Sequence, residues 1–264
     1  MASFVGRVAR YLPPALLLAV AVVAWQVGSG IWNLPDYILP RPTAIWGALV
    51  DERGLLSTSA LSTLQTAVLG FLLALVAGLA LAILIHYSRL LELAVYPLVV
   101  ASQTVPIVAL APVLVVLFGF SLLPRLIVVA LVCFFPITVN AVDGFRSVDP
   151  DLVRLMRTLG AGRWRLFRDV EWPTALPYLF SGAKVAVTYS VIGALYGELA
   201  GSSEGLGYLT TQKLAQFDTA GLFAAVVLLS VMGIGLFVVV ALAERLLVPW
   251  QHELRQRDAL VKRR

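Results

Sequence analysis

The sequence contains few charged residues. Only 13% of its 264 residues are Asp, Glu, Lys or Arg, whereas 60% are hydrophobic and the mean hydropathy is +0.91. An ordinary soluble domain is about a quarter charged. This shortage of charge excludes such a domain and indicates a membrane protein, whose length suits about six helices of roughly 20 residues each.

Cysteine and the common catalytic motifs are also scarce. The single cysteine, Cys133, lies in an apolar run, which excludes an intramolecular disulfide and a cysteine metal site. No GxxxxGK[ST] motif is present, so we expect no ATP hydrolysis by this chain. There is also no HExxH or GxSxG motif, and His86 and His252 are far apart in sequence. We therefore predict a protein without catalytic residues, without a metal site and with no cofactor bound by this chain.

The apolar runs predict an all-α membrane protein whose residues 1–264 form a single transmembrane domain. The first run continues to about Ile31 with no clear small-residue cleavage site, so we interpret it as an uncleaved span. Prolines interrupt the third and fourth runs, and lipid tolerates such breaks only where protein or a cavity covers the freed backbone groups. The six expected spans are 12–31, 61–85, 93–118, 125–145, 178–199 and 221–248.

The positive charges are distributed unevenly between alternate connections. If the N-terminus lies inside, 15 of the 20 Lys and Arg residues fall on inner segments, only 4 on outer ones, and Lys184 lies near the inner end of the fifth span. Positive residues concentrate on the cytoplasmic side of membrane proteins. The distribution predicts cytoplasmic termini, and it explains the net charge of +5 without nucleic acid as a partner. We also expect Trp32 and Trp46 at headgroup depth.

The longest polar interval between spans is 147–177, SVDPDLVRLMRTLGAGRWRLFRDVEWPTALP. Asp149 is a natural N-cap, with Pro150 at the first helical position. The helix that they start is expected to end at about Leu159, where Gly160 can supply a left-handed residue. The interval therefore begins with a short helix and a tight turn.

A second short helix is expected over 163–171. Its i, i+3 spacing places Trp164 and Phe167 on one face. We expect Pro173 to end this helix and Pro177 to open the fifth span. The interval should therefore form a bent plug with an apolar tip surrounded by arginines.

The spacing within this interval resembles the cytoplasmic loop of bacterial ABC importer permeases, which reads EAA, three residues, G, nine residues, I, one residue and LP. With that glycine on Gly160, the isoleucine falls on Val170 and LP on Trp172-Pro173. The departures are Arg154-Leu155-Met156 for EAA and Trp172 for Leu. Further stretches resemble the branch of this family that imports sulfonates, nitrate, taurine, thiamine-precursor pyrimidines and flavins: VPIVALAPVLVVLFG, CFFPITVNAVDGF, TLGAGRWRLFRDV and GELAGSSEGLGYL.

The resemblance implies a MetI-like, type I permease fold in a bacterial inner membrane. It implies a second permease copy, two copies of an ABC ATPase subunit that hold ATP and Mg²⁺, and an extracytoplasmic substrate-binding protein. A thiamine-precursor pyrimidine is the first expected substrate, followed by a sulfonate, nitrate, taurine or riboflavin. Interval 147–177 would be the coupling loop, with contacts to the ATPase from Arg157, Thr158, Leu159, Gly160, Ala161, Arg163, Trp164, Arg165, Phe167 and Pro173.

Polar residues inside or beside the spans are candidates for the transport route. Such residues are costly in lipid and often functional, although each can also bond to a carbonyl of its own helix or bridge two helices. Glu198 and Glu204 flank the last outer loop, where they could help to close an outer gate, touch a binding protein or simply be solvated. The route candidates are Gln103, Thr104, Asn140, Thr188 and Tyr189.

Three other interpretations compete with an ABC permease. An ion-coupled secondary transporter would need ionisable residues at mid-span, and the sequence has none away from the span ends. The basic interval could instead be a loop attracted to anionic lipid. The chain could also be a membrane scaffold without transport activity, which the proline-broken spans argue against.

Overall fold

The computed structural model describes residues 2–31, 35 and 37–250, and within these residues it contains helices and short connections but no strand. Five helices are long and apolar enough to cross a membrane. The all-α class is therefore confirmed. The five helices are α1 (Ala2–Ile31), α3 (Arg53–Tyr87), α7 (Leu122–Arg146), α10 (Trp172–Gly201) and α12 (Thr219–Leu247).

The region expected to form the third span is broken into pieces. It comprises α4 (Arg89–Ala94), α5 (Tyr96–Ser102) and α6 (Ile107–Phe118), and the chain bends by 100° between Ser102 and Ile107. Pro106 has an extended backbone and caps α6. Because its ring fixes φ and it has no N–H to donate, the preceding helix cannot continue through it.

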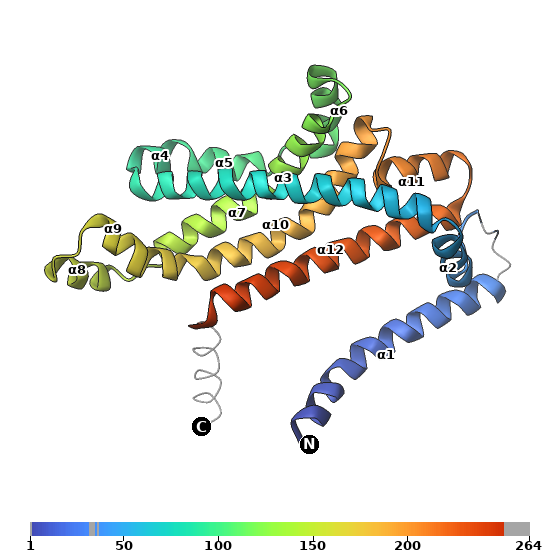
Figure 1. The fold of residues 1–264 in the computed structure, drawn as a ribbon, viewed down its shortest axis with the longest axis horizontal. Helices are drawn as coiled ribbons and strands as arrows, with labels where there is room; N and C mark the ends of the chain where they lie inside the picture. The colour runs from blue at the N-terminus through green and yellow to red at the C-terminus, as the bar shows by residue number, and fades with distance from the viewer. Residues whose placement is uncertain (1, 32–34, 36, 251–264) are drawn as a thin grey trace.

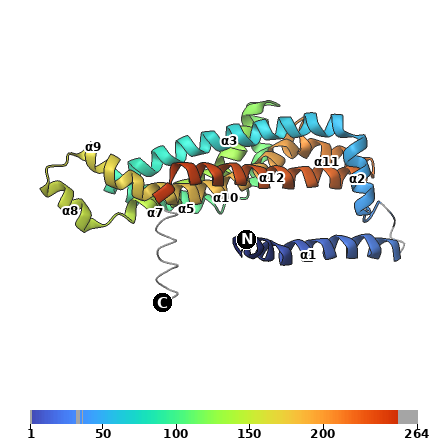
Figure 2. The ribbon, with the colours of Figure 1, turned by 60° about the horizontal axis from the view of Figure 1, so that its bottom comes forward.

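Four of the shorter helices lie at the two ends of the bundle. Figure 1 shows α8 (Pro150–Thr158) and α9 (Arg163–Leu166) at one end, which we call the loop end. At the opposite end, which we call the α11 end, lie α2 (Pro42–Asp51) and α11 (Leu206–Ala215). The view in Figure 2 keeps the same separation.

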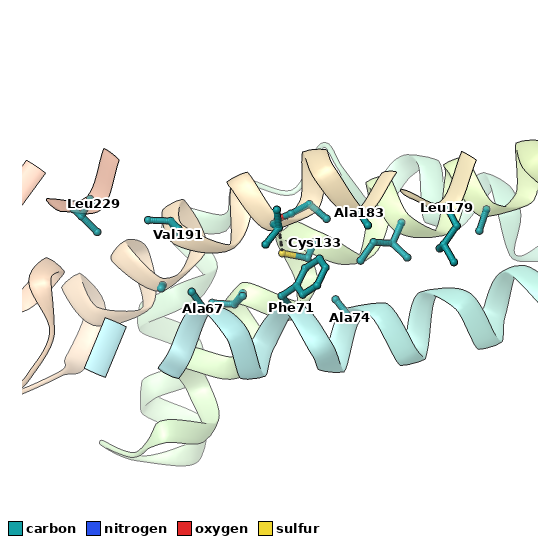
Figure 3. Close-up of a cluster of buried hydrophobic side chains, with 14 of the residues drawn as sticks. Ala67, Phe71, Ala74, Cys133, Leu179, Ala183, Val191 and Leu229 are labelled. Carbon is teal, nitrogen blue, oxygen red and sulfur yellow. Dashed lines mark hydrogen bonds between the residues drawn. The ribbon is translucent and has the colours of Figure 1, made fainter. Parts of the chain in front are cut away.

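The core forms where α7 packs against α3 and α10. Small residues let these helices approach closely: a Cβ on Gly182 of α10 would lie only 2.5 Å from the carbonyl oxygen of Pro136 in α7. Cys133 is fully buried there, and its thiol donates to the carbonyl of Ala186 over 3.1 Å (Figure 3). The cysteine is therefore a core residue, as its apolar sequence context suggests.

Helix α1 lies to one side of the bundle (Figures 1 and 2). Near its C-terminal end, the ring of Trp25 lies 5.8 Å from that of Phe223 in α12, and Gln26 donates to Thr43 of α2. Leu16, Leu17 and Leu18 are exposed. This apolar surface has the character of a helix that faces lipid or another membrane chain.

The expectation that Pro173 ends the second short helix and Pro177 opens the fifth span is wrong. Helix α9 continues through a π-helical turn, η1 (Phe167–Glu171), directly into α10. Pro173 then occupies the first turn of α10, where no N–H is needed, and Pro177 lies inside the helix. The wide π-turn relaxes the hydrogen-bond ladder just before the prolines, so the chain remains helical.

Two expectations fall on residues whose structure is not described. Trp32 and the basic residues of 251–264 lie outside the described residues. Trp46, the other tryptophan expected at headgroup depth, lies in α2 and is exposed.

Candidate functional site

The loop end begins with the local structure that its sequence indicates. The Asp149 carboxylate accepts a hydrogen bond from the backbone N–H of Asp151 over 2.8 Å, and Pro150 occupies the first turn of α8. Gly160 follows the helix with φ = +79°, a conformation that favours glycine. A Cβ at Gly160 would meet nothing within 4 Å. Glycine is therefore needed there for its backbone conformation alone.

Apolar side chains at the loop end point outward. Leu159 and Trp164 are 71% and 73% exposed, and Leu152 and Leu155 are exposed beside them. The surrounding residues are basic, and Arg154 pairs locally with Asp151 over 2.9 Å. An exposed Trp next to arginines is typical of a protein–protein contact surface. We call Leu155, Leu159 and Trp164 the apolar tip.

Phe167 connects this tip to the helical bundle. Its ring stacks on Trp164, with the centroids 5.9 Å apart, and on Phe145 of α7, at 6.2 Å. The rings of Tyr87 and Trp172 lie 6.4 Å and 6.0 Å away. Phe167 belongs to the π-turn. Through its ring contacts, a continuous group of aromatic rings joins the exposed tip to α3, α7 and α10.

Glu171, at the end of the π-turn, ties the same region to α3. Its side chain is buried, and its Oε2 accepts a hydrogen bond of 2.6 Å from the Tyr87 hydroxyl. His86 Nε2 lies 3.3 Å from the same oxygen, and the His86 ring stacks on Phe145 with a centroid distance of 4.9 Å. A buried carboxylate without partners would be costly. These contacts therefore fix the direction in which the loop leaves the bundle.

The α11 end contains a buried carboxylate of a different kind. Glu198 is only 1% exposed, and its Oε2 accepts hydrogen bonds from the N–H of Gly207, over 2.7 Å, and from the hydroxyl of Thr63, over 3.0 Å. The N–H of Leu206 donates to the same hydroxyl over 2.8 Å. Glu198 and Thr63 together satisfy the first donors of α11. The expectation that Glu198 is solvated or touches a binding protein is therefore wrong.

The glycines that follow are explained by this carboxylate. Gly205 has φ = +98°, and a Cβ there would overlap the carboxyl group of Glu198. A Cβ on Gly207 would lie 2.8 Å from the carbonyl oxygen of Leu195. The run SSEGLG is thus shaped to pass over a buried side chain.

Glu204 is placed differently from Glu198. Its side chain is 60% exposed, and its Oε1 accepts a hydrogen bond of 3.0 Å from Nη2 of Arg125, a buried residue in the first turn of α7. Nε and Nη1 of Arg125 are buried without a hydrogen-bond partner in the described part of the chain. Oε1 of Glu198 has none there either.

A cluster of three charged side chains, centred on Lys213, joins three elements at the α11 end. Lys213 is buried and pairs with Glu52, between α2 and α3, and with Asp218, at a distance of 2.7 Å. Asp218 also caps α12 by accepting from the N–H of Gly221 over 2.9 Å. Burial alone would raise the pKa of Asp218, but the hydrogen bonds from Lys213 and Gly221 outweigh it and lower that pKa. Burial opposes the charge of Lys213, and its two carboxylate partners nevertheless raise its pKa.

The residues proposed to line the transport route lie apart from the groups described at the loop end and at the α11 end. Gln103 and Thr104 are exposed at the bend before α6, Asn140 faces α10 from α7, and Thr188 and Tyr189 are exposed on α10. The Thr104 and Thr188 hydroxyls and the Asn140 amide each donate to a carbonyl of their own segment. Among the described residues, no hydrogen bond joins two of the five candidates, and no group of three His, Cys, Asp or Glu could hold a metal ion.

Several residues of these clusters were missed by reasoning on the sequence. In the sequence, Arg125 and Lys213 are counted only as charges of the outer segments. Lys184, placed there near the inner end of the fifth span, pairs with Glu244 of α12 over 2.7 Å. Glu171 counts there only as the last residue of the short helix expected over 163–171. The available signal was an ionisable residue flanked by apolar ones, which marks burial and not its partner.

Comparison with known proteins gives consistent matches. The family model "Binding-protein-dependent transport system inner membrane component" matches residues 70–252. The chain is 39% identical over 241 residues to a formylaminopyrimidine transport permease protein, ThiX, of Halalkalibacterium halodurans, covering 91% of this chain and 96% of that protein. It is also 39% identical to a riboflavin transport system permease protein, RibX, of Chloroflexus aurantiacus, covering 91% and 90%.

A more distant relative and a solved structure agree with these matches. A putative aliphatic sulfonates transport permease protein, SsuC, of Bacillus subtilis is 32% identical, covering 90% of this chain and 87% of that protein. Among solved structures, an inward-facing MetNI methionine ABC transporter matches with a TM-score of 0.59 at 20% identity, covering 72% of this chain and 97% of its own. At that identity the match supports the fold alone.

Proposed function

The chain belongs to the family of binding-protein-dependent transport system inner membrane components and is a permease of an ABC importer for a small solute; from this premise we propose that it carries a thiamine-precursor pyrimidine. The support is its 39% identity to a formylaminopyrimidine permease over nearly the whole of both chains. Riboflavin is the second candidate, because a riboflavin permease is equally identical. Sulfonates and nitrate follow, since the corresponding relatives are more distant. Taurine is placed with them because it is itself a sulfonate.

The loop end is the proposed docking site for an ATPase subunit. In this proposal the ATPase subunit, and not this chain, binds ATP and Mg²⁺. The observation that carries this proposal is the apolar tip, exposed to solvent yet stacked through Phe167 onto the bundle. A tip held in this way can bury Trp164 in a partner and pass a displacement to the spans. The basic residues Arg157, Arg163 and Arg165 would frame the contact, and Pro173 would support the exit of the loop.

The remaining arrangement follows from the same premise. Two copies of the chain would enclose the route, two ATPase subunits would bind the two loop ends on the cytoplasmic side, and a binding protein would deliver substrate at the α11 ends. The charge distribution supports cytoplasmic termini. Closure of the ATPase pair would draw the loop ends together and open the α11 ends.

The route and the gate are assigned to separate residues. Thr188 and Tyr189 are exposed on α10 and could face a second copy, and Gln103 and Thr104 lie at the bend before α6. Asn140 would contribute from α7. The gate would lie around α11, where Glu198 fixes the start of the helix and Glu204 holds the preceding loop to Arg125.

The docking role is tested by a double substitution, Arg157→Glu with Trp164→Ala. We expect the ATPase subunit to stop co-purifying with the permease and the stimulated ATP turnover to fall to the level of the ATPase alone. Trp46→Ala is the matched control, because Trp46 is similarly exposed at the opposite end of the bundle. Unchanged co-purification and turnover in the double variant would show that the loop instead rests on lipid.

The substrate is tested through the binding protein that works with this permease. Calorimetric titration with a formylaminopyrimidine, riboflavin, taurine and nitrate should give tightest binding for the pyrimidine. Uptake of the same labelled compound into proteoliposomes should require the permease, the ATPase and ATP. Tight binding and uptake of riboflavin instead would replace the first candidate by the second.

A further inference from the structure

Arg125 is a buried cation held by one carboxylate. Its Cα and Cβ pack closely against α10: a Cβ built on Gly197 would be 3.0 Å from Cα and 3.3 Å from Cβ of Arg125. Its Nη2 donates to Glu204, whose side chain is 60% exposed, while Nε and Nη1 are buried without a partner in the described residues. A guanidinium has five N–H donors, so most of its capacity is unused here.

A second carboxylate lies next to the same loop. Glu198 directly follows Gly197, against which Arg125 packs, and its carboxyl group lies against Gly205, the residue after Glu204. Its Oε2 is bound to Thr63 and Gly207, whereas its Oε1 is buried and without a partner in the described part of the chain. Both groups therefore lie close to one short segment, 202–205, because Arg125 bonds to Glu204 and the Glu198 carboxyl contacts Gly205.

The energetics favour a change of partner. A buried ionic atom without a hydrogen bond is costly, for the guanidinium as well as for the carboxylate. Pairing Arg125 with Oε1 of Glu198 would satisfy both groups, and it would leave the two hydrogen bonds that Oε2 makes at the start of α11 in place. Releasing Glu204 would cost little by comparison, since that side chain is already exposed to water.

We propose that Arg125 is a positioning residue that exchanges partners during transport: it holds Glu204 in the conformation described here, and it binds Oε1 of Glu198 when segment 202–205 is released and the gate opens. This inference rests on the proposed function. In the first state the ion pair fastens the loop before α11 to the start of α7. In the second state the loop is free to move and the buried charges are fully paired. The two states differ in whether segment 202–205 is fastened to α7, and the same guanidinium serves both.

The test uses the complete complex of permease and ATPase in proteoliposomes, with ATP turnover measured with and without the loaded binding protein. Glu204→Gln weakens the first state, and we expect turnover without the binding protein to rise roughly five-fold, the lower end of common coupling energies. Glu198→Gln keeps the shape of the side chain and an acceptor for α11 but weakens the second state. It should lower the stimulated turnover by a similar factor without raising the unstimulated turnover.

The controls separate this exchange from a packing role. Arg53→Gln removes an exposed arginine at the α11 end that has no ion pair among the described residues, and it should behave as wild type. Arg125→Lys keeps one bond to Glu204 but loses the additional donors, so stimulated turnover should fall even if Glu198→Gln proves unstable. The exchange would be overturned if Glu204→Gln and Glu198→Gln changed ATP turnover equally and with the same sign. It would also be overturned if Arg125→Lys had the same turnover as the wild type. A wild-type complex that the binding protein does not stimulate would overturn the proposed function instead.

Discussion

The two ends of the bundle differ in where they place most of their charged side chains. At the loop end, Leu159 and Trp164 are exposed and the arginines lie beside them at the surface. At the α11 end, Glu198, Arg125 and Lys213 are turned inward and are at most 8% exposed. The loop end therefore presents exposed apolar side chains beside arginines, as a contact surface would, whereas the α11 end pairs several of its charges inside the protein.

The comparison shows how one helix can serve both ends. Helix α10 directly follows the π-turn that carries Glu171 and has Glu198 in its last turn, and both residues are buried carboxylates. Glu171 is held by side chains of α3, which can stay in place as the loop is loaded. Glu198 is held by the first donors of α11 and by Thr63. Under the proposed coupling, a displacement of α10 would therefore reach α3 at one end and α11 at the other.

The largest effect is expected from Lys213→Met, which leaves Glu52 and Asp218 without their cation. Breaking a buried ion pair costs about 3 to 5 kcal/mol, and we expect about 3 kcal/mol because both carboxylates keep part of their surface exposed. Chemical denaturation in detergent measures this loss, and Arg53→Met is the control. A loss no greater than that of Arg53→Met would show that the charged cluster does not stabilise the α11 end.

The pH dependence of the same cluster follows from its two shifted groups. The lowered pKa of Asp218 gives stability that is present at neutral pH and is lost as the pH falls through that pKa, below the usual value of about 3.9. The raised pKa of Lys213 gives stability that is lost only as the pH rises above about 10.4. The difference between wild type and Lys213→Met should therefore stay constant from about pH 5 to pH 9.

Gly205→Ala comes next and tests the close packing of the α11 end. The substitution forces a positive φ on alanine and places its Cβ on the Glu198 carboxyl, at a cost of about 2 kcal/mol. Thermal unfolding measures the change. Gly47→Ala, inside α2 with nothing within 4 Å of its Cβ, should be neutral or slightly stabilising. Equal melting temperatures for the two variants would contradict the packing around Glu198.

Tyr87→Phe has a smaller effect, at the other end. It removes the hydroxyl that donates to Glu171 and should cost about 1.5 kcal/mol, because His86 remains beside the carboxylate. The same change at Tyr178, whose hydroxyl has no hydrogen bond among the described residues, is the control. If Glu171 only stabilises the fold, Tyr87→Phe should leave the number of substrates transported per ATP unchanged; if it transmits loop movement, that number should fall.

Gly160→Ala is expected to have the smallest effect on stability, and it gives the sharpest contrast with Gly205→Ala. Both glycines have positive φ, but only Gly205 packs against other atoms, so Gly160→Ala should cost about 1 kcal/mol from backbone strain alone. Co-purification of the ATPase should weaken more than stability does. A larger loss of stability here than at Gly205 would reverse the distinction between the two ends.

Much of the loop end could be predicted because its signals are local. The cap at Asp149, the left-handed Gly160 and the shared face of Trp164 and Phe167 each depend on residues within a few positions of one another. The prediction failed at Pro173, because a single π-turn changes the register of the helix without any local composition that marks it. The direction of α10 is set by Tyr87 and His86, more than 80 residues earlier.

The sequence by itself determined the membrane class, the number of apolar runs, the polar interval and the family, since these depend on composition, periodicity and short spacings. Only the tertiary structure decided that Glu198 is buried and Glu204 exposed, that Arg125 pairs with Glu204, and that Lys213 joins three elements. A charge in an apolar sequence must find a partner, but that partner lies wherever the packed helices bring it, as Thr63 reaches Glu198 across 135 residues.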